Sequence, residues 1–162
     1  MNNFTIKYVQ GVKIGIFPFT KSLSCEFDER LERLFATTYN TFLDGKCLTT
    51  FFDAGEDGRH IELWEESKVF VDFIHECMEY YGEDQAYNVT NMWANRYPKH
   101  SFIPPHRHMF YDKTISGVYY KEAPKDCGDL VVKLPCDEIY RYTPNKGDTI
   151  FFPSYLDHWT EP

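Results

Sequence analysis

Three histidines in the second half of the chain have the spacing of a metal site. His106 and His108 are separated by one residue, and His158 follows much later in the sequence. Side chains two positions apart on an extended strand point to the same face, so the close pair can share one ion. A third ligand can come from a strand that lies beside the pair only in the folded protein. Three ligands on one face of an octahedron leave positions open for a co-substrate and for oxygen, as in non-haem iron enzymes.

The identity of the third ligand has alternatives in this sequence. Asp112 lies a short way beyond His108 and would supply a carboxylate if the chain turns there. We favour the three-histidine set. In another interpretation His108 faces the pocket without binding the metal, and only His106 and His158 are ligands. Asp157, next to His158, is expected to face solvent on a strand or turn.

The motifs around the histidines occur in a characteristic order. In chain order they are Trp93-Ala94-Asn95, His106-Arg107-His108, Ser116-Gly117-Val118-Tyr119-Tyr120, Gly147-Asp148, Phe152-Pro153-Ser154 and His158. Over about residues 87–162, this order resembles a family of small 2-oxoglutarate/Fe(II)-dependent oxygenases found in bacteria and in tailed phages. The resemblance implies a double-stranded β-helix, which is the jelly-roll or cupin-like fold. It also implies a hydroxylase that uses Fe(II) and 2-oxoglutarate on an unknown substrate.

The resemblance assigns the iron to His106, His108 and His158, with no catalytic residue beyond these ligands. The larger superfamily has His-x-Asp or His-x-Glu at the close pair, whereas His-x-His is usual in the family that this chain resembles. An imidazole in place of the carboxylate leaves the charge of the dication uncompensated by its ligands.

The resemblance also suggests which residues bind the co-substrate. The strand that contains Ser116 would line the cavity, and the two-residue period of a strand puts Tyr120 on the same face as Ser116. Asn95 is a candidate donor to the co-substrate's carboxylate or to an oxygen bound to the metal. The pocket walls are expected to include Phe110, Tyr111, Phe151 and Tyr155.

The usual anchor for the far carboxylate of 2-oxoglutarate is absent. In the family an Arg on the strand after the distal histidine makes this contact, which suits its planar, forked side chain. This sequence stops at Pro162. We expect either a truncated chain or a substitute anchor, with Lys121, Lys133 and Arg141 as candidates. A partner chain, such as a second copy in a homo-oligomer, could close the sheet.

Two other functions fit the same histidines. One is a 2-oxoglutarate-independent, cupin-like dioxygenase with a three-histidine iron centre, which the missing Arg favours. The other is a binding protein without activity on a degenerate β-helix, which would take up no metal. Because all three predict a similar fold, the fold cannot choose among them.

Composition limits the classes of protein that fit. A chain of 162 residues with 43% hydrophobic residues predicts one globular domain. The net charge of −8 argues against broad binding to nucleic acids or anionic membranes. Five cysteines without CxxC spacing, and the lack of a signal peptide or an apolar span, predict a protein of the cytoplasm, which for a phage protein is the host's. The substrate would be a small molecule, a peptide or a nucleotide.

The apolar patterns predict an α+β protein with its helices packed on one outer face of the sheets. Residues 1–86 would form N-terminal strands and supporting helices, and residues 87–162 the β-helix core with the metal site. Helices are expected from Ser24 to about Phe42 and from Glu62 to Tyr81. Strands are expected over 4–9, 12–17, 87–94, 114–121, 129–134, 138–142 and 148–152.

Overall fold

The protein is a mixed α/β structure dominated by sheets. The computed structural model describes residues 4–37, 41–42, 47–51, 58, 60–82, 85–108 and 113–162. These residues contain three sheets and two α-helices. The chain divides into two compact units, residues 1–20 with 99–162 and residues 21–98. No helix in the described part has the length and apolar character needed to cross a membrane.

The first sheet of the first unit contains four antiparallel strands in the order β1-β2-β9-β6. The strands are β1 (Thr5–Val9), β2 (Val12–Pro18), β9 (Asp148–Pro153) and β6 (Ile115–Tyr119). Gln10 and Gly11 join β1 to β2 with φ angles of 51° and 77°. A two-residue hairpin turn of this hand suits the right-handed twist of its strands. All four strands were expected from the sequence.

The second sheet of this unit has the order β10-β7-β8. Its strands are β10 (His158–Thr160), β7 (Leu130–Lys133) and β8 (Ile139–Tyr142). The segment from Ile103 to His106 lies beside β10 and extends the sheet there. The Thr160 amide donates to the Ile103 carbonyl over 3.3 Å, and His106 and His158 exchange both backbone hydrogen bonds. β10 is not among the strand ranges predicted from the apolar pattern, although the third histidine was expected on a strand beside the pair.

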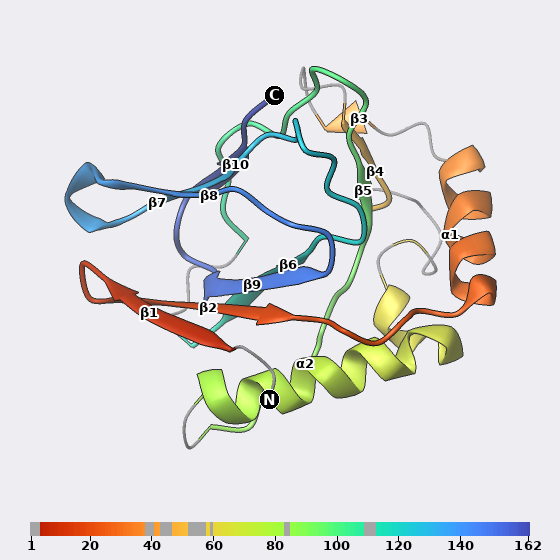
Figure 1. Cartoon of the computed structure of the whole chain (residues 1–162), viewed down its shortest axis with the longest axis horizontal. Coiled ribbons are helices and arrows are strands. Elements are labelled where there is room, and N and C mark those ends of the chain that lie inside the picture. The colour runs from red at the N-terminus through yellow and green to blue at the C-terminus, as the bar shows by residue number, and fades with distance from the viewer. Residues whose placement is uncertain are drawn as a thin grey trace. The chain divides into compact units, whose positions relative to one another are not determined.

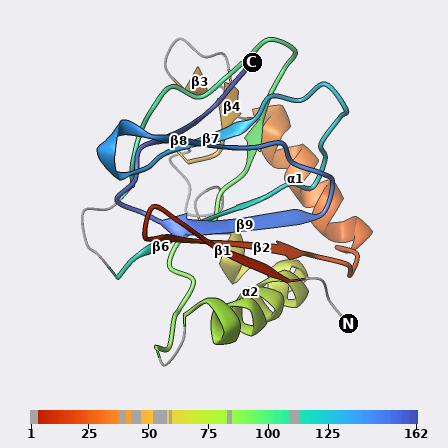
Figure 2. The same ribbon diagram turned by 60° about the vertical axis from the view of Figure 1, so that its left-hand side comes forward.

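The core of the first unit lies between its two sheets, which form two layers in Figures 1 and 2. Alternate residues of β2, β7 and β9 fill it, because side chains on a strand alternate between faces. The buried members are Val12, Ile14, Leu130, Val132, Leu134, Ile150, Phe152 and Leu156. Val118 and Tyr120 pack against this cluster from the β6 side. Through Phe152, which contacts the His158 ring, this core also reaches the start of β10.

Gly117, in the centre of β6, is required by a close contact with the neighbouring strand. A Cβ at this position would lie 2.7 Å from the Phe151 ring. Replacing Gly117 with Ala should therefore lower the free energy of unfolding by about 1–3 kcal/mol, as is typical of overpacking. Chemical denaturation of Gly117→Ala in the wild-type and Phe151→Leu backgrounds tests this. An equal cost in both backgrounds would show that the Phe151 ring is not the cause.

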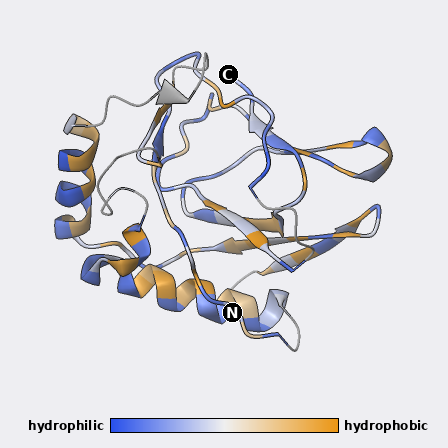
Figure 3. Cartoon of the chain, turned by 180° about the vertical axis from the view of Figure 1, so that it is seen from behind, coloured by the Kyte–Doolittle hydropathy of each residue, from blue (hydrophilic) through white to orange (hydrophobic). Residues whose placement is uncertain are grey.

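The first helix of the second unit is α1 (Cys25–Thr37). Ser24 caps it as predicted, because its hydroxyl accepts a hydrogen bond from the Phe27 amide over 3.2 Å. Its buried face packs with Ile61 and Trp64 and consists of Phe27, Leu31 and Phe35. Figure 3 shows polar residues along another side of the same helix.

The predicted end of this helix at Phe42 is wrong. Thr41 and Phe42 form the short strand β3 (Thr41–Phe42). At the helix end, the Thr37 hydroxyl donates to the Leu34 carbonyl over 3.0 Å. The sequence beyond Thr37 is rich in β-branched and aromatic residues, which favour strands over helices.

The second helix, α2 (Lys68–Tyr81), begins later than the predicted Glu62. Two 3-10 turns, Ile61–Leu63 and Glu65–Ser67, precede it. Trp64 between them is extended (ψ 136°), which interrupts the helical path. Gly82 ends α2 as expected, but with φ −81° rather than in the left-handed region. A Cβ there would lie 2.4 Å from the Tyr87 ring, so close packing requires the glycine.

A small antiparallel sheet of order β3-β4-β5 completes the second unit, with β4 at Cys47–Thr49 and β5 at Asn95–Arg96. The strand predicted over 87–94 is absent from the described structure, apart from an isolated bridge at Met92. Met92 and Ala94 make single backbone bonds to Ile61 and Thr50 instead of a ladder. The apolar residues of this segment fill gaps beside the core of α1, where Met92 and Ala94 pack.

Candidate metal centre

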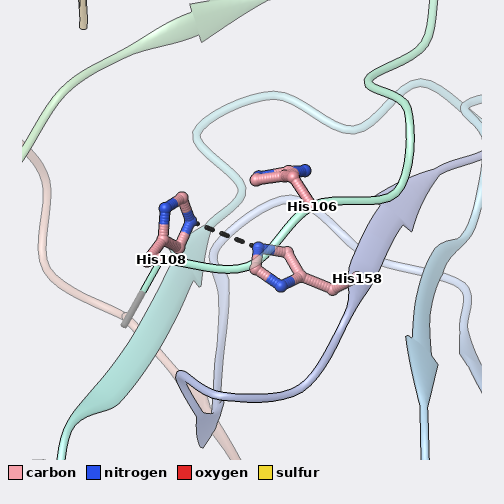
Figure 4. A group of neighbouring side chains, drawn as sticks. All are labelled: His106, His108 and His158. Atoms are coloured by element: carbon pink, nitrogen blue, oxygen red, sulfur yellow. Dashed lines mark hydrogen bonds between the residues drawn. The ribbon is translucent and has the colours of Figure 1, made fainter. Parts of the chain in front are cut away.

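The three predicted histidines lie together in the first unit. One nitrogen from each of His106, His108 and His158 lies within 4.8 Å of the other two. Figure 4 shows the rings grouped together, two from one segment and the third from the neighbouring strand. His106 and His108 come shortly before residues 109–112, which are outside the described residues. His158 is the first residue of β10.

Backbone pairing between distant parts of the chain creates this cluster. The His106 amide donates to the His158 carbonyl over 3.0 Å, and the His158 amide donates to the His106 carbonyl over 2.9 Å. The His108 amide donates to the Ser154 carbonyl over 3.4 Å. These bonds place the His-x-His segment beside His158 and the turn after β9, through an isolated bridge, with both of its imidazoles near His158.

Two of the rings are fixed in the tautomer that suits a metal ligand. The Nδ1 atom of His106 lies 2.9 Å from the Pro104 carbonyl oxygen, and that of His158 lies 3.0 Å from the Leu156 carbonyl oxygen. A carbonyl oxygen only accepts hydrogen bonds, so each Nδ1 carries the proton. The lone pair of each ring is therefore on Nε2, and a backbone carbonyl orients the ring, as is usual around metal sites.

The spacing between rings also suits a shared ion. The Nε2 atoms of His108 and His158 are 3.2 Å apart. Ligand nitrogens about 2.1 Å from a metal at right-angle positions would be about 3 Å apart. Because Nε2 of His158 carries a lone pair, Nε2 of His108 must carry the proton of this hydrogen bond when no ion is bound. An ion would take the place of that proton and bind the lone pairs of both Nε2 atoms.

Burial keeps the three imidazoles neutral, which is the form that binds metals. Desolvation, together with the neighbouring His106, lowers the pKa of His158 to about 3 and that of His108 to about 4. Desolvation also lowers the pKa of His106. The donor set therefore fits a metal dication around neutral pH.

The walls next to the histidines come from the core and from two serines. The Phe152 ring, which is fully buried, contacts the His158 ring edge to face with centroids 4.8 Å apart. Ser116 donates a hydrogen bond from its hydroxyl to that of Ser154 over 2.9 Å. Because the Ser154 carbonyl also accepts from His108, this pair connects β6 to the His-x-His segment.

The other two predicted co-substrate residues belong to segments other than those that carry the histidines. Tyr120 is on the inner face as expected, but it follows the far end of β6 and its amide donates to Asp148 at the start of β9. Its hydroxyl is buried without a hydrogen-bond partner, and burial raises its pKa. Asn95 is in β5 of the second unit, opposite Thr49.

The residues expected to line the pocket lie in different environments. Tyr155 packs against the core of the first unit. Phe151 does not share the face of Phe152, since adjacent residues on a strand alternate, and it contacts Phe17 with centroids 5.7 Å apart. The predictions for Phe110, Tyr111 and Asp112 fall outside the described residues.

Two of the three candidate anchors for a carboxylate are occupied. Lys133 forms an ion pair with Asp137 at 2.6 Å, and Arg141 forms one with Glu161 at 3.1 Å. Both basic side chains are more than 40% exposed. They lie on the same face as Val131, opposite the core residues of β7. Neither therefore faces the space between the sheets.

Sequence reasoning missed an ion pair between the residues that flank the ligands. The Arg107 guanidinium donates from Nε and Nη2 to the two carboxylate oxygens of Asp157, over 2.7 and 2.8 Å. Asp157 was expected to be a solvent-facing residue, and its side chain is in fact 30% exposed and paired. The sequence offered one indication of this ion pair, namely that Arg107 and Asp157 have opposite charge and are each adjacent to a histidine of the cluster.

Comparisons with known proteins support the fold. No protein-family model matches the chain, and no curated protein matches it. A solved structure that it resembles is the crystal structure of a prolyl-4-hydroxylase from Pseudomonas putida, with a TM-score of 0.57 and 15% sequence identity. The similarity covers 92% of this chain and 84% of that chain. At this identity the comparison establishes a shared fold.

Proposed function

We propose that this chain is a non-haem iron(II), 2-oxoglutarate-dependent oxygenase that hydroxylates its substrate. The observation that carries the proposal is the cluster of His106, His108 and His158, with ligand nitrogens within 4.8 Å of one another. Neutral rings oriented by backbone carbonyls are suitable ligands for Fe(II).

The arrangement of the first unit supports this proposal. Two antiparallel sheets enclose an apolar core, and the histidines lie where the second sheet is extended by its edge segment. We infer that these sheets form a double-stranded β-helix. The protein that shares this fold is a hydroxylase by name.

The residues of the chain would hold and shield the reactive centre. His106, His108 and His158 would bind the iron through Nε2, and Phe152 would exclude water behind His158. Ser116 and Ser154 offer hydroxyls beside the His-x-His segment for the co-substrate. Tyr120 and Asn95 remain proposed co-substrate contacts. Iron, 2-oxoglutarate and dioxygen together would supply the oxidising chemistry, in which one oxygen atom goes to succinate as 2-oxoglutarate loses CO2 and the other hydroxylates the substrate.

A three-histidine dioxygenase that does not use 2-oxoglutarate is the second candidate. The pairing of Lys133 and Arg141 with acids, on the face away from the core, favours it. A dioxygenase that binds its substrate directly to iron needs no cation for a distant carboxylate. The ligand set would be the same.

An anaerobic titration with Fe(II) and then 2-oxoglutarate, followed by visible absorption, separates the candidates. The proposed function predicts a charge-transfer band that needs both ligands and disappears in His106→Ala. Iron binding without this band would support the three-histidine dioxygenase. If the wild-type protein bound no iron, both enzymatic proposals would be overturned. His75→Ala, which changes an exposed helical histidine in the second unit, is the control.

A further inference from the structure

The Arg107–Asp157 ion pair joins the two segments that carry the histidines. Arg107 is the central residue of the His-x-His motif, and Asp157 directly precedes His158. Both carboxylate oxygens accept hydrogen bonds, over 2.7 and 2.8 Å. A two-bond contact between a guanidinium and a carboxylate fixes orientation as well as distance.

The pair spans a place where the strand pairing is irregular. His106 pairs with His158, but the His108 amide bonds to the Ser154 carbonyl. Moving two residues along one segment therefore corresponds to moving four along the other, because residues 154–156 form the turn between β9 and β10, which a hydrogen bond from the Leu156 amide to the Pro153 carbonyl closes over 3.2 Å. The side chains of Arg107 and Asp157 meet at the end of this turn.

Asp157 is also held from its other side. The Lys133 amide of β7 donates to the Asp157 carbonyl over 2.8 Å. The preceding residue, Leu156, is buried in the core, and its carbonyl oxygen accepts from Nδ1 of His158. The ion pair thus connects the His-x-His segment to the peptide that orients the His158 ring.

We propose that the Arg107–Asp157 pair is a positioning device that sets the distance between the His108 and His158 imidazoles for metal binding. This inference rests on the proposed function, because it assumes that the histidines bind a metal. An exposed ion pair contributes little to folding, typically about 0–1 kcal/mol. Its effect should therefore appear in metal affinity rather than in stability.

Metal titrations of single and double variants test the proposal, with Co(II) as an air-stable spectroscopic probe and Fe(II) under anaerobic conditions. Arg107→Gln and Asp157→Asn should each raise the Kd by about 3- to 10-fold, less than the effect of losing a direct hydrogen bond to a ligand. The double variant should bind about as weakly as either single one, because both remove the same contact. The Co(II) absorption bands should shift in all three.

The direction in which the Kd changes in Arg107→Gln and in Asp157→Asn distinguishes a positioning role from a purely electrostatic one. If only charge mattered, loss of Arg107 would strengthen the binding of a cation and loss of Asp157 would weaken it. Positioning predicts weaker binding in both. Lys146→Gln and Glu122→Gln make the same charge changes in another exposed ion pair of this unit and should leave the Kd unchanged.

The outcomes also distinguish this inference from the proposed function. Wild-type protein that binds no metal, or binds it as well in His106→Ala, would contradict the metal site itself. Histidine-dependent binding with wild-type affinity in both Arg107→Gln and Asp157→Asn, or shifts of opposite sign, would overturn the positioning role alone.

Discussion

Replacing His158 with alanine is expected to raise the Kd for Fe(II) by about a hundredfold or more, since each of a few protein ligands supplies several kcal/mol of binding energy. His158 lies within hydrogen-bonding distance of the His108 ring, at 3.2 Å, and is the most buried of the three. Its loss removes the ligand contributed by β10 and leaves two ligands from one segment. Isothermal titration under anaerobic conditions measures the change.

A control for folding is needed because His158 is only 4% exposed. Its side chain also holds the Leu156 carbonyl, so circular dichroism and the thermal midpoint of the apo-protein should be recorded for the variant. His106→Ala provides a second test at a half-buried position, and the exposed His75→Ala should bind like wild type. Unchanged affinity in a folded His158→Ala protein would show that the metal binds elsewhere.

The sequence predicted the strands of the first unit other than β10 because their packing produces a local pattern. In β9, Ile150 and Phe152 face the core while Thr149 and Phe151 face the other side, and β-branched and aromatic residues dominate. The sequence also predicted that the three histidines lie together, from the one-residue spacing of His106 and His108. Only the position of His158 required a contact between distant segments.

Predictions failed where tertiary contacts decide the local structure. The apolar residues between Tyr87 and Ala94 suit a strand, but they fill space beside α1 and pair through single bonds. The 3-10 turns before α2 follow from the extended backbone at Trp64, which no helical period indicates. The Arg107–Asp157 pair forms only when the His-x-His segment lies beside the turn between β9 and β10, which is a contact between distant parts of the chain.

Tertiary contacts also explain why the protonation state of the histidines could not be predicted from residue types. A histidine in water titrates near pH 6.5. In this fold, burial lowers the pKa of His158 to about 3 and of His108 to about 4. The Phe152 ring, which belongs to the core between the sheets, packs against His158 and contributes to its burial. The core therefore determines the protonation state of the ligands as well as their position.

Replacing Phe152 with alanine should consequently affect both stability and metal binding. Phe152 is fully buried, and loss of a buried Phe ring costs about 3–5 kcal/mol of unfolding free energy. The His158 ring would also lose its edge-to-face neighbour at 4.8 Å, so metal affinity should fall in the protein that remains folded. Denaturant unfolding and a metal titration below the transition measure the two effects.

Phe102→Ala is the matched control, because Phe102 belongs to the same unit and is 37% exposed. It should cost less than about 1 kcal/mol, as expected outside a core. A loss of stability in Phe152→Ala with unchanged metal affinity would show that backbone contacts alone fix the His158 ring. A cost no larger than that of Phe102→Ala would contradict the assignment of Phe152 to the core. Loss of both properties would show that the packing between the sheets orients the ligand contributed by β10.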